Sequence, residues 1–447
     1  MIKTDVLIVG GGAAGIVTAL TAKDNYPDKD VTVVRKEEKT LVPCGIPYIF
    51  GTLGSVEKDL IPDDILKKGG INLVIDEITS IDLKEKVAEG HNSGKIAFEK
   101  LILATGSKPL VPPIRGVDKE NVFQVKKDSK YLSMMKERIK ESQDIVIIGG
   151  GFIGVEFADE LRKLNKNISI VEMLPHVLYN SFDDEFCEMA EAELRRMGVK
   201  VYTNTKVKEI TGEKSVEGIV LSDSKNLNAD LVIVAAGVRP NTELAERMGL
   251  KVSMYGIEVD EYMRTSHPDV FAVGDCAEKR DFFTRKPKLT LLASVATAEA
   301  RIAGANLYRI KAFKQFKGTL GIFATKVGDL SLGEAGLIER SAKAEGFEYV
   351  VGRSNVPDKH PALLPDTSEV SAKLIFTRQG GFFIGGQLAG GETIGEMINL
   401  IGFAIESGYT AAKYISLQIG THPLLTPAPT APATIKAAED ALREIYS

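Results

Sequence analysis

The chain has 447 residues, more than one hydrophobic core usually holds, so two or three domains are expected. Apolar residues make up 44% and charged residues 26%, and the net charge of −5 gives no basis for binding nucleic acid. No apolar run reaches the roughly 18 residues that a membrane span needs, and no signal peptide precedes the first strand. The three cysteines are far apart, which favours a reducing compartment, so we expect a soluble cytoplasmic protein with no membrane partner.

The first elements along the chain form a dinucleotide-binding unit. Residues 5–9 are typical of a buried parallel strand, and residues 10–15 (Gly-Gly-Gly-Ala-Ala-Gly) lead into a helix and a second strand at 31–34. The glycines permit a tight turn and close approach to a pyrophosphate, to which the helix N-terminus offers N–H groups. The second strand ends on Arg35, where an acid is usual. Arg35 is therefore predicted to bind a 2′-phosphate, a ribose or an adenine, with a solvated loop cation as the alternative.

The next segment contains the strongest candidate for a reactive group. Residues 41–48 read Leu-Val-Pro-Cys-Gly-Ile-Pro-Tyr, and a disulfide-exchanging site in this setting usually has two cysteines five positions apart. The two corresponding positions around Cys44 are Lys39 and Ile49. The glycine and proline after Cys44 favour the start of a helix, which would stabilise the thiolate that attacks a sulfur–sulfur bond. The alternative is an inert buried cysteine.

A second dinucleotide-binding unit repeats the first pattern. A strand at 144–148, a glycine turn at 149–154 (Gly-Gly-Gly-Phe-Ile-Gly), a helix and a strand at 168–171 are followed by Glu172. Glu172 lies 21 positions after Gly151, the distance at which an acid reaches the ribose hydroxyls. It would repel a 2′-phosphate, and no cation follows it, so NADH is predicted over NADPH. Two complete units predict bound nucleotide far more strongly than one glycine motif does.

Later segments extend the duplication. Residues 101–106 form a strand and a small-residue turn, and residues 231–237 repeat them at nearly the spacing of the two glycine loops. Residues 270–275 place Asp275 directly after a buried strand and a glycine, where its carboxylate can accept hydrogen bonds from the sugar or ribityl hydroxyls of a second ligand. The pattern predicts an α/β fold with two Rossmann-like domains.

Together these motifs resemble the flavoprotein pyridine nucleotide–disulfide oxidoreductase family along the whole chain. The resemblance implies a glutathione-reductase-like fold with an FAD-binding domain at residues 1–112 and 240–315, an inserted NAD-binding domain at 113–239, and a C-terminal α+β dimerisation domain at 316–447. One cysteine followed by Gly-Ile-Pro-Tyr is similar to the subgroup of coenzyme A disulfide reductases, NADH-dependent persulfide or polysulfide reductases, and NADH oxidases and peroxidases.

The resemblance also implies the residues that bind each cofactor, and it implies no metal. For FAD they are Gly10, Gly12, Ala13, Ala14, Gly15, Arg35, Lys36, Pro43, Ile78, Ala104, Thr105, Gly106, Gly274, Asp275 and Ala293. For NADH they are Gly149, Gly151, Phe152, Ile153, Gly154, Glu156, Glu172 and Gly237. Phe152 matches an aromatic residue that gates the nicotinamide pocket.

Positions at which this sequence departs from the motifs of the subgroup reduce the number of candidate acceptors. Peroxidases and many oxidases have a histidine inside the first glycine motif, where this chain has Ala13 and Ala14. Coenzyme A disulfide reductases tend to have an arginine in the first helix, where this chain has Thr21. Residues 420–427 (Gly-Thr-His-Pro-Leu-Leu-Thr-Pro) resemble the His-Pro stretch of the two-cysteine reductases, which predicts His422 as the proton donor to the leaving thiol, with packing at a dimer surface as the alternative.

We therefore predict an FAD-dependent homodimer that takes hydride from NADH and reduces a persulfide, a polysulfide or coenzyme A disulfide through Cys44. The enzymatic alternative is an NADH oxidase, and the alternative of another class is an electron-transfer or redox-sensing flavoprotein. Cys187 and Cys276 are predicted to be core residues. Residues 426–434 are predicted to form a proline-rich linker before a terminal helix, with no sulfur-transfer domain appended.

Overall fold

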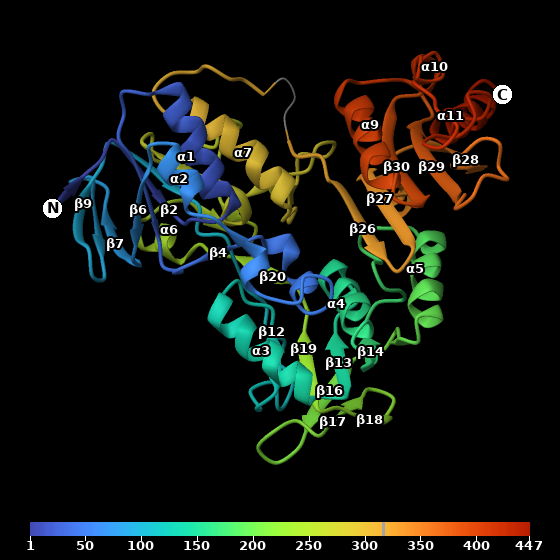
Figure 1. Cartoon of the computed structure of the whole chain (residues 1–447). Helices are drawn as coiled ribbons and strands as arrows, with labels where there is room; N and C mark the ends of the chain where they lie inside the picture. The colour runs from blue at the N-terminus through green and yellow to red at the C-terminus, as the bar shows by residue number, and fades with distance from the viewer. Residues whose placement is uncertain (315–317) are drawn as a thin grey trace. The chain divides into compact units, whose positions relative to one another are not determined.

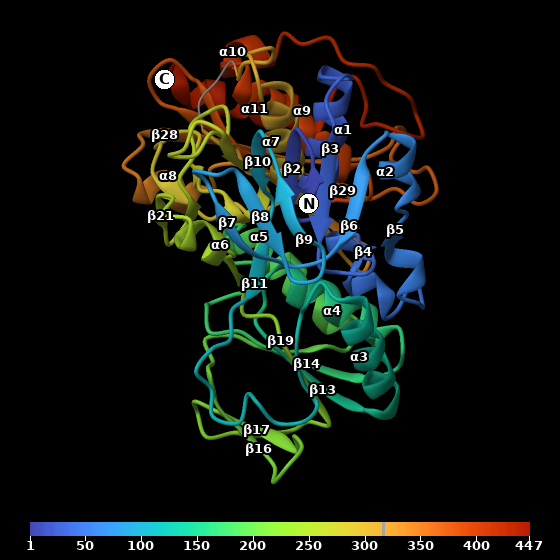
Figure 2. The same cartoon turned by 90° about the vertical axis from the view of Figure 1, so that its left-hand side faces the viewer.

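The computed structural model describes residues 1–314 and 318–447, and the chain divides into two units (Figures 1 and 2). Unit 1 comprises Met1–Pro112, Phe123–Glu141 and Ala236–Thr319. Unit 2 comprises Pro113–Val122, Ser142–Ala235 and Leu320–Ser447. The predicted domain boundary between residues 315 and 316 lies outside the described residues.

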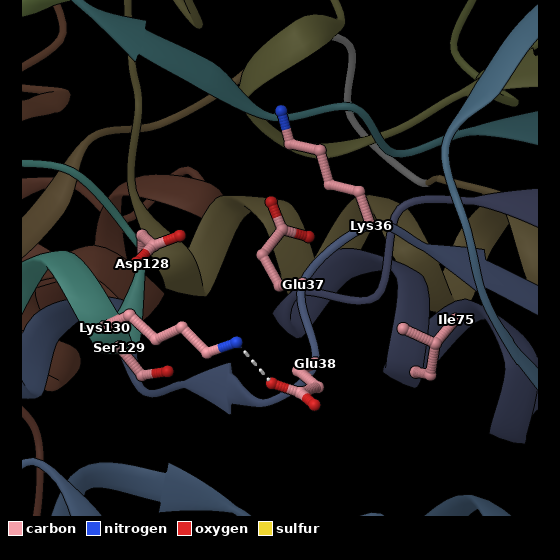
Figure 3. Close-up of a pocket in the computed structure, with 7 residues that line it drawn as sticks. All are labelled: Lys36, Glu37, Glu38, Ile75, Asp128, Ser129 and Lys130. Carbon is pink, nitrogen blue, oxygen red and sulfur yellow. Dashed lines mark ion pairs between the residues drawn. The ribbon is translucent and has the colours of Figure 1, made fainter. Parts of the chain in front are cut away.

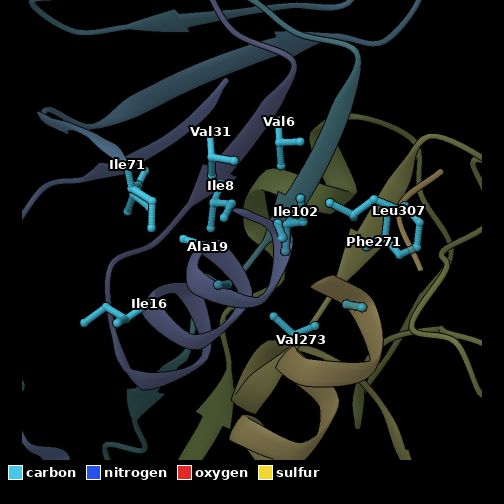
Figure 4. Packing of buried hydrophobic residues seen from close by; sticks show 14 of the residues in the cluster. Val6, Ile8, Ile16, Ala19, Val31, Ile71, Ile102, Phe271, Val273 and Leu307 are labelled. Atoms are coloured by element: carbon cyan, nitrogen blue, oxygen red, sulfur yellow. The ribbon is translucent and has the colours of Figure 1, made fainter. Parts of the chain in front are cut away.

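Unit 1 is built on a five-stranded parallel sheet whose strands are short apolar runs. In spatial order these strands are β23 (Val270–Ala272), β10 (Lys100–Leu103), β2 (Val6–Val9), β3 (Val31–Arg35) and β6 (Asn72–Ile75). Strands with this composition belong in a sheet that is covered on both faces. Helices α1 (Ala13–Asn25) and α7 (Ala293–Ala305) lie side by side against the sheet, where Ile8 and Ile102 pack with Ile16 and Ala19 (Figure 4).

The other strands of unit 1 form smaller sheets around this core. One sheet has four strands, in the order β1 (Ile2–Lys3), β9 (Gly94–Ala97), β8 (Val87–Gly90) and β7 (Ile78–Asp82). The remaining strands form pairs: β4 (Thr40–Leu41) with β5 (Leu60–Ile61), β11 (Ser107–Pro109) with β20 (Val238–Pro240), β21 (Val252–Ser253) with β22 (Gly256–Ile257), and β24 (Lys279–Arg280) with β25 (Pro287–Lys288). Its other helices are α2 (Asp64–Lys68), α3 (Ser129–Glu141) and α6 (Glu243–Arg247).

Unit 2 contains the second five-stranded sheet. In spatial order its strands are β12 (Val122–Gln124), of which only Val122 belongs to unit 2, then β19 (Leu231–Val234), β13 (Asp144–Ile148), β14 (Asn167–Val171) and β15 (Lys200–Tyr202). The order β19-β13-β14-β15 repeats the order β10-β2-β3-β6 of unit 1, so the duplication seen in the sequence is also a duplication of topology. Helices α4 (Phe152–Arg162) and α5 (Asp184–Arg196) pack on it, and β16 (Val207–Thr211), β17 (Gly218–Leu221) and β18 (Asn226–Asn228) form a small sheet.

The C-terminal part of unit 2 is an antiparallel sheet with helices, as predicted for an α+β domain. In spatial order its strands are β26 (Ile322–Val327), β27 (Leu330–Gly336), β30 (Phe383–Gly390), β29 (Glu369–Thr377) and β28 (Tyr349–Pro357). Helix α9 (Ile394–Glu406) packs on β27 and β30, and α11 (Ala433–Ile445) packs on β28 and β29, with α8 (Glu339–Ala344) and α10 (Ala411–Tyr414) beside them. The predicted fold class is confirmed. Among the described residues, no helix is long and apolar enough to span a bilayer.

Candidate active site

The first glycine loop connects β2 to α1 and is closed on one side and open on the other. A Cβ on Gly10 (φ +114°) would lie 2.1 Å from the Ala104 oxygen, and one on Gly15 would lie 1.9 Å from the Gly10 oxygen. At Gly12, the N-cap of α1, an added Cβ would meet no described atom within 4 Å. The first turn of α1 has no acidic side chain, so its N–H groups are available to an anion. This surface fits a pyrophosphate.

The turn after β10 is fixed against this loop. The Ala104 N–H donates to the Val9 oxygen at 2.8 Å. The Thr105 hydroxyl donates to the Asn241 oxygen at 2.7 Å, and the Asn241 side chain donates back to the Thr105 oxygen at 3.2 Å. At Gly106 (φ +70°) an added Cβ would again meet no described atom within 4 Å. Two predicted FAD segments from distant parts of the chain therefore meet at one edge of the sheet.

Asp275 lies in a single 3₁₀ turn, η4 (Gly274–Cys276), that packs against α7. Its carboxylate accepts from the Ser107 hydroxyl at 2.7 Å and from Lys127 Nζ at 3.2 Å. Burial alone would raise the pKa of Asp275, but Lys127 and Ser107 hold it below its usual value. The residue is therefore an ionised acceptor, as binding of a polyol requires.

A buried ion pair supports that turn from below. Glu299 of α7 accepts from the Gly274 N–H at 2.9 Å and lies 3.2 Å from Lys279 Nζ, which also donates to the Ala277 oxygen at 2.9 Å. Both side chains are almost completely buried. Because the pair bonds the backbone on both sides of Asp275, it fixes the direction in which that carboxylate projects. Ala293, another predicted FAD residue, is the first residue of α7.

Arg35 is buried, so the alternative of a solvated loop cation is wrong. Its guanidinium binds both carboxylate oxygens of Asp63, at 2.7 and 2.8 Å, and donates to the oxygens of Glu37 and Glu38. Its aliphatic stem lies against Gly11. Arg35 thus shapes the segment between β3 and the Cys44 turn, and contact with FAD stays a prediction.

Two other predicted FAD residues lie near the same strands. Lys36 lines a hollow of about 230 Å³ whose wall also includes an ion pair of 2.9 Å between Lys130 and Glu38 (Figure 3). The other lining residues are Glu37, Ile75, Asp128 and Ser129. Ile78 is the first residue of β7 and is buried in a cluster with Val9 and Val34.

Cys44 lies in a single 3₁₀ turn, η1 (Pro43–Gly45), which η2 (Pro47–Ile49) follows. The predicted helix start is wrong here. Proline at position 47 has no N–H with which to continue an α-helix from Pro43. Thr40, at the start of the preceding strand, donates its hydroxyl to the Gly11 oxygen at 3.1 Å, so the segment is attached to the glycine loop.

The three cysteines differ sharply in environment. Cys44 is exposed, whereas Cys187 and Cys276 are buried, as predicted for core residues. Burial raises the pKa of the Cys187 thiol to about 12 and also raises that of Cys276. Neither buried thiol is ionised near neutral pH, so Cys44 is the candidate nucleophile.

The second glycine loop has the geometry of the first. A Cβ on Gly154 would lie 2.0 Å from the oxygen of Gly149 (φ +108°), and one on Gly151 would meet no described atom within 4 Å. The carboxylate of Glu172 accepts from the Gly150 N–H at 2.6 Å and from the Leu174 N–H at 2.7 Å. Each oxygen keeps capacity for a second donor, so Glu172 can hold the loop and still accept from a ribose.

The first turn of α4 presents an aromatic and an acidic side chain. The ring of Phe152 packs edge to face on Phe323, with 4.9 Å between centroids, and Ile153 beside it is half-buried. Glu156, one turn later, accepts from the Thr325 hydroxyl at 3.0 Å, and burial raises its pKa to about 7. The predicted NAD residues of unit 2 thus gather at the start of one helix. Gly237 belongs to unit 1.

Comparison with known proteins identifies the family. The model for pyridine nucleotide-disulphide oxidoreductases matches residues 4–300, and the model for the dimerisation domain of the same family matches residues 322–433. The chain belongs to this family.

Curated relatives and solved structures agree with this assignment. The chain is 33% identical to an NADH oxidase of Methanocaldococcus jannaschii over 98% of this chain and 99% of that protein. It is 31% identical to an NAD(P)H coenzyme A polysulfide/persulfide reductase of Pyrococcus horikoshii over 95% and 96%. Its structure resembles that of an NAD-dependent persulfide reductase from A. fulgidus with a TM-score of 0.91 and 30% identity, covering 98% of this chain and 83% of that one.

The family uses FAD and a pyridine nucleotide, and the loops described above fit both. Each unit has a glycine loop with one face open at its central glycine and a helix N-terminus behind it. The two glycine loops, one in each unit, thus have the geometry expected for the nucleotides that the family uses.

His422 lies in an exposed loop of unit 2, whereas Cys44 is in unit 1. In the neutral ring, the Nδ1 atom of His422 accepts from the Leu424 N–H at 3.3 Å. The loop also contacts a second histidine, because the Nδ1 atom of His360 is 3.0 Å from the Thr426 oxygen.

Sequence reasoning missed several residues that shape these sites. Ser107, Lys127, Lys279, Glu299 and His360 belong to no motif, and only folding brings them to their partners. One signal was available for Glu299, since an acid in the middle of the small-residue helix 293–305 needs a buried partner.

Proposed function

We propose that this oxidoreductase is an FAD-dependent NADH:disulfide or persulfide reductase in which Cys44 is the catalytic thiol. The observation that carries the proposal is the exposure of Cys44 on a turn attached to the first glycine loop through Thr40. The relatives named as persulfide or polysulfide reductases support a sulfur acceptor. The match to the dimerisation domain supports a homodimer, and we expect it in the cytoplasm.

Residues of both units would hold the cofactors. In unit 1, the open face at Gly12 would hold the FAD pyrophosphate, and Asp275 would accept from its ribityl chain. In unit 2, the open face at Gly151 would hold the NADH pyrophosphate, and Glu172 would accept from its ribose. Bound FAD would supply the electron pair, taken as hydride from NADH, that resolves a mixed disulfide.

Cys44 would perform the sulfur chemistry. Its thiolate attacks one sulfur of the acceptor, so that a Cys44–sulfur bond forms, the acceptor's sulfur–sulfur bond breaks and the first thiolate leaves. Two electrons then reduce the mixed disulfide, which releases the second thiol and restores the Cys44 thiolate. The second thiolate needs a proton, and we propose that His422 supplies it as the imidazolium and is reprotonated from solvent.

Peroxide is a weaker candidate for the acceptor. Reduction of a peroxide calls for a general acid near the glycine loop, and Ala13 and Ala14 at the start of α1 carry no titratable group. A sulfur acceptor needs no such group at that position, because a thiolate is already a good leaving group.

The decisive experiment is anaerobic turnover of NADH with persulfide, polysulfide and coenzyme A disulfide, comparing wild type with Cys44→Ser. We expect the variant to lose sulfur-acceptor turnover while NADH still bleaches its flavin absorbance. Cys187→Ala is the matched control, since that thiol is buried and protonated, and it should retain turnover. Full activity of Cys44→Ser with every sulfur acceptor would refute the proposal.

His422→Ala tests the proton donor separately. We expect slower turnover and loss of one limb of the pH profile, and an unchanged rate and profile would remove His422 from the mechanism.

An NADH oxidase is the second candidate, favoured by the NADH oxidase of M. jannaschii at 33% identity. It predicts that oxygen consumption with NADH exceeds turnover with every sulfur acceptor in the same enzyme preparation.

A further inference from the structure

A buried carboxyl group lies directly beneath the Cys44 turn, and the proposed mechanism gives it no role. Asp59 is only 3% exposed. Its Oδ1 atom lies against Gly45, where an added Cβ would be 1.8 Å from it. Within the described residues, its Oδ2 atom is buried and has no hydrogen-bond partner. Buried carboxylate oxygens are normally bonded, so this exception calls for an explanation.

Pairing of two short strands brings Asp59 to this place. Strand β4 runs antiparallel to β5, with Leu41 opposite Leu60, and the Val42 N–H donates to the Asp59 oxygen at 2.9 Å. The turns at the ends of these strands, η1 with Cys44 and η3 (Glu57–Asp59), are therefore adjacent. The backbone of Asp59 is thus paired with the segment that leads to Cys44, which keeps the Asp59 Cα atom beside the turn.

Burial dominates the electrostatics of Asp59. It raises the pKa of Asp59 to about 6. The charged groups on neighbouring elements are Glu57 and Lys58 in η3, Lys39 before β4, and Lys136 in α3. The pKa of the exposed Glu57 is lowered mainly by hydrogen bonds from its own backbone and from Ser55, and the charges of Lys39 and Lys136 lower it further. Asp59 thus has a buried carboxyl group with one unpartnered oxygen, and this group lies against the turn that contains Cys44.

We propose that Asp59 is a positioning residue that controls the charge state of the Cys44 thiol, opposing the thiolate when the carboxyl group is ionised and permitting it when the group is protonated. This inference rests on the proposed role of Cys44 as nucleophile. A negative charge on the buried carboxyl group disfavours a second one on the nearby thiol, so the two groups titrate as a coupled pair. Asp59 thereby makes the reactivity of Cys44 depend on pH in the range where cells operate.

The size of the effect follows from the geometry. The Asp59 carboxyl group lies against Gly45, and neighbouring Cα atoms are about 3.8 Å apart, so the Cys44 sulfur lies within about 10 Å of that group. With an effective dielectric constant of about 20, reduced by the solvent exposure of Cys44, the coupling is about one pH unit.

The test is the rate at which iodoacetamide alkylates Cys44 in the holoenzyme, between about pH 5 and about pH 10 and without NADH or acceptor. For Asp59→Asn we expect the midpoint of the rate profile to fall by about one pH unit and the rate near neutral pH to rise about tenfold. Glu57→Gln is the matched control, because it removes an exposed carboxylate from the same turn, and its midpoint should not move. An unchanged midpoint in Asp59→Asn, or an equal shift in Glu57→Gln, would overturn the inference.

Two further measurements keep the test decisive if the asparagine amide disturbs the turn. Asp59→Leu removes the charge without adding a donor and should shift the midpoint in the same direction, so an opposite shift counts against the inference. In wild type, the alkylation rate should rise with pH, level off near pH 6, where Asp59 titrates, and then rise again. A rate that rises with pH without this interruption overturns the inference. Alkylation by iodoacetamide involves no sulfur acceptor, so it tests the coupling separately from the proposed function. If Asp59→Asn shifts the midpoint but Cys44→Ser still reduces the sulfur acceptors, the proposed function is refuted and the Asp59 coupling stands.

Discussion

The buried Lys373 on β29 gives the sharpest stability prediction. Its Nζ atom lies 2.8 Å from Asp183, 2.7 Å from Glu185 and 2.8 Å from Glu339. Lys373 and Asp183 are 3% and 7% exposed, whereas Glu185 and Glu339 are 43% and 32% exposed. The exposed partners contribute little, so the pair with Asp183 dominates the cost of removing the lysine.

Replacing Lys373 by methionine leaves a buried carboxylate without its cation. Removing one partner of a buried pair costs about 3–5 kcal/mol. Asp183 keeps the Gln387 side chain at 2.6 Å and the backbone N–H groups of Glu339 and Arg340, which favours the lower end, about 3 kcal/mol. With an m value of about 3 kcal/mol per molar urea, the unfolding midpoint of Lys373→Met should fall by about 1 M.

The assay is urea unfolding followed by circular dichroism, with Lys343→Met on the exposed side of α8 as control. Burial alone would raise the pKa of Asp183, but Lys373 and Gln387 hold it below its usual value. A lowered pKa stabilises the fold above the unfolded value of about 3.9, and this effect is lost as the pH falls from there through the lower folded value, so wild type and variant should converge in acid. A midpoint change below about 0.2 M, or an equal change in the control, would refute the reasoning.

Three further predictions concern unit 2. Gly151→Val should raise the KM for NADH more than tenfold, while the FAD content stays unchanged. The space beside Gly151 contains no described atom, so the free energy of unfolding should change by less than about 0.5 kcal/mol. Normal NADH kinetics would show that this face does not bind the nucleotide. Glu172→Ala should reduce the preference for NADH over NADPH, measured as the ratio of kcat/KM values, about tenfold, and an unchanged ratio would count against Glu172 as its source. The pKa of Glu156 is raised to about 7, so this residue stabilises the fold below its unfolded pKa and loses that effect as the pH rises through 7. The Tm of Glu156→Gln should therefore increase relative to that of wild type between mildly acidic and mildly alkaline solution. Tm curves that stay parallel over this pH range would contradict the prediction.

The two Rossmann-like sheets could be predicted because their signals are local. An apolar strand, a glycine turn and a helix occupy consecutive residues, and the same order occurs twice, so no distant contact was needed to find the open faces at Gly12 and Gly151. The turn at Cys44 was predicted less well. The glycine and proline after Cys44 favoured the start of a helix, but Pro47 lies four residues after Pro43 and has no N–H to bond the Pro43 oxygen, so an α-helix cannot continue there.

The residues that adjust the chemistry could not be predicted. Asp59 reaches the Cys44 turn only through the pairing of β4 with β5, two strands of two residues each, which no periodicity reveals. Lys127 and Ser107 approach Asp275 from segments far away in the sequence, and a surface lysine and a strand-end serine have no distinctive pattern. Sequence motifs locate the glycine loops that are predicted to bind the cofactors, and tertiary contacts determine the electrostatics around them.

The hydrogen bond from Thr40 to Gly11 has a consequence for the whole catalytic cycle. It joins the segment that carries the thiol to the loop that faces the dinucleotide, so a displacement of one is transmitted to the other. Binding free energies at two connected sites are reciprocal. If filling the glycine loop changes how tightly Cys44 retains a thiol adduct, then forming that adduct must change the affinity for the dinucleotide by the same factor. In the proposed function, this one hydrogen bond would therefore link the affinity for the dinucleotide to the formation of a thiol adduct on Cys44.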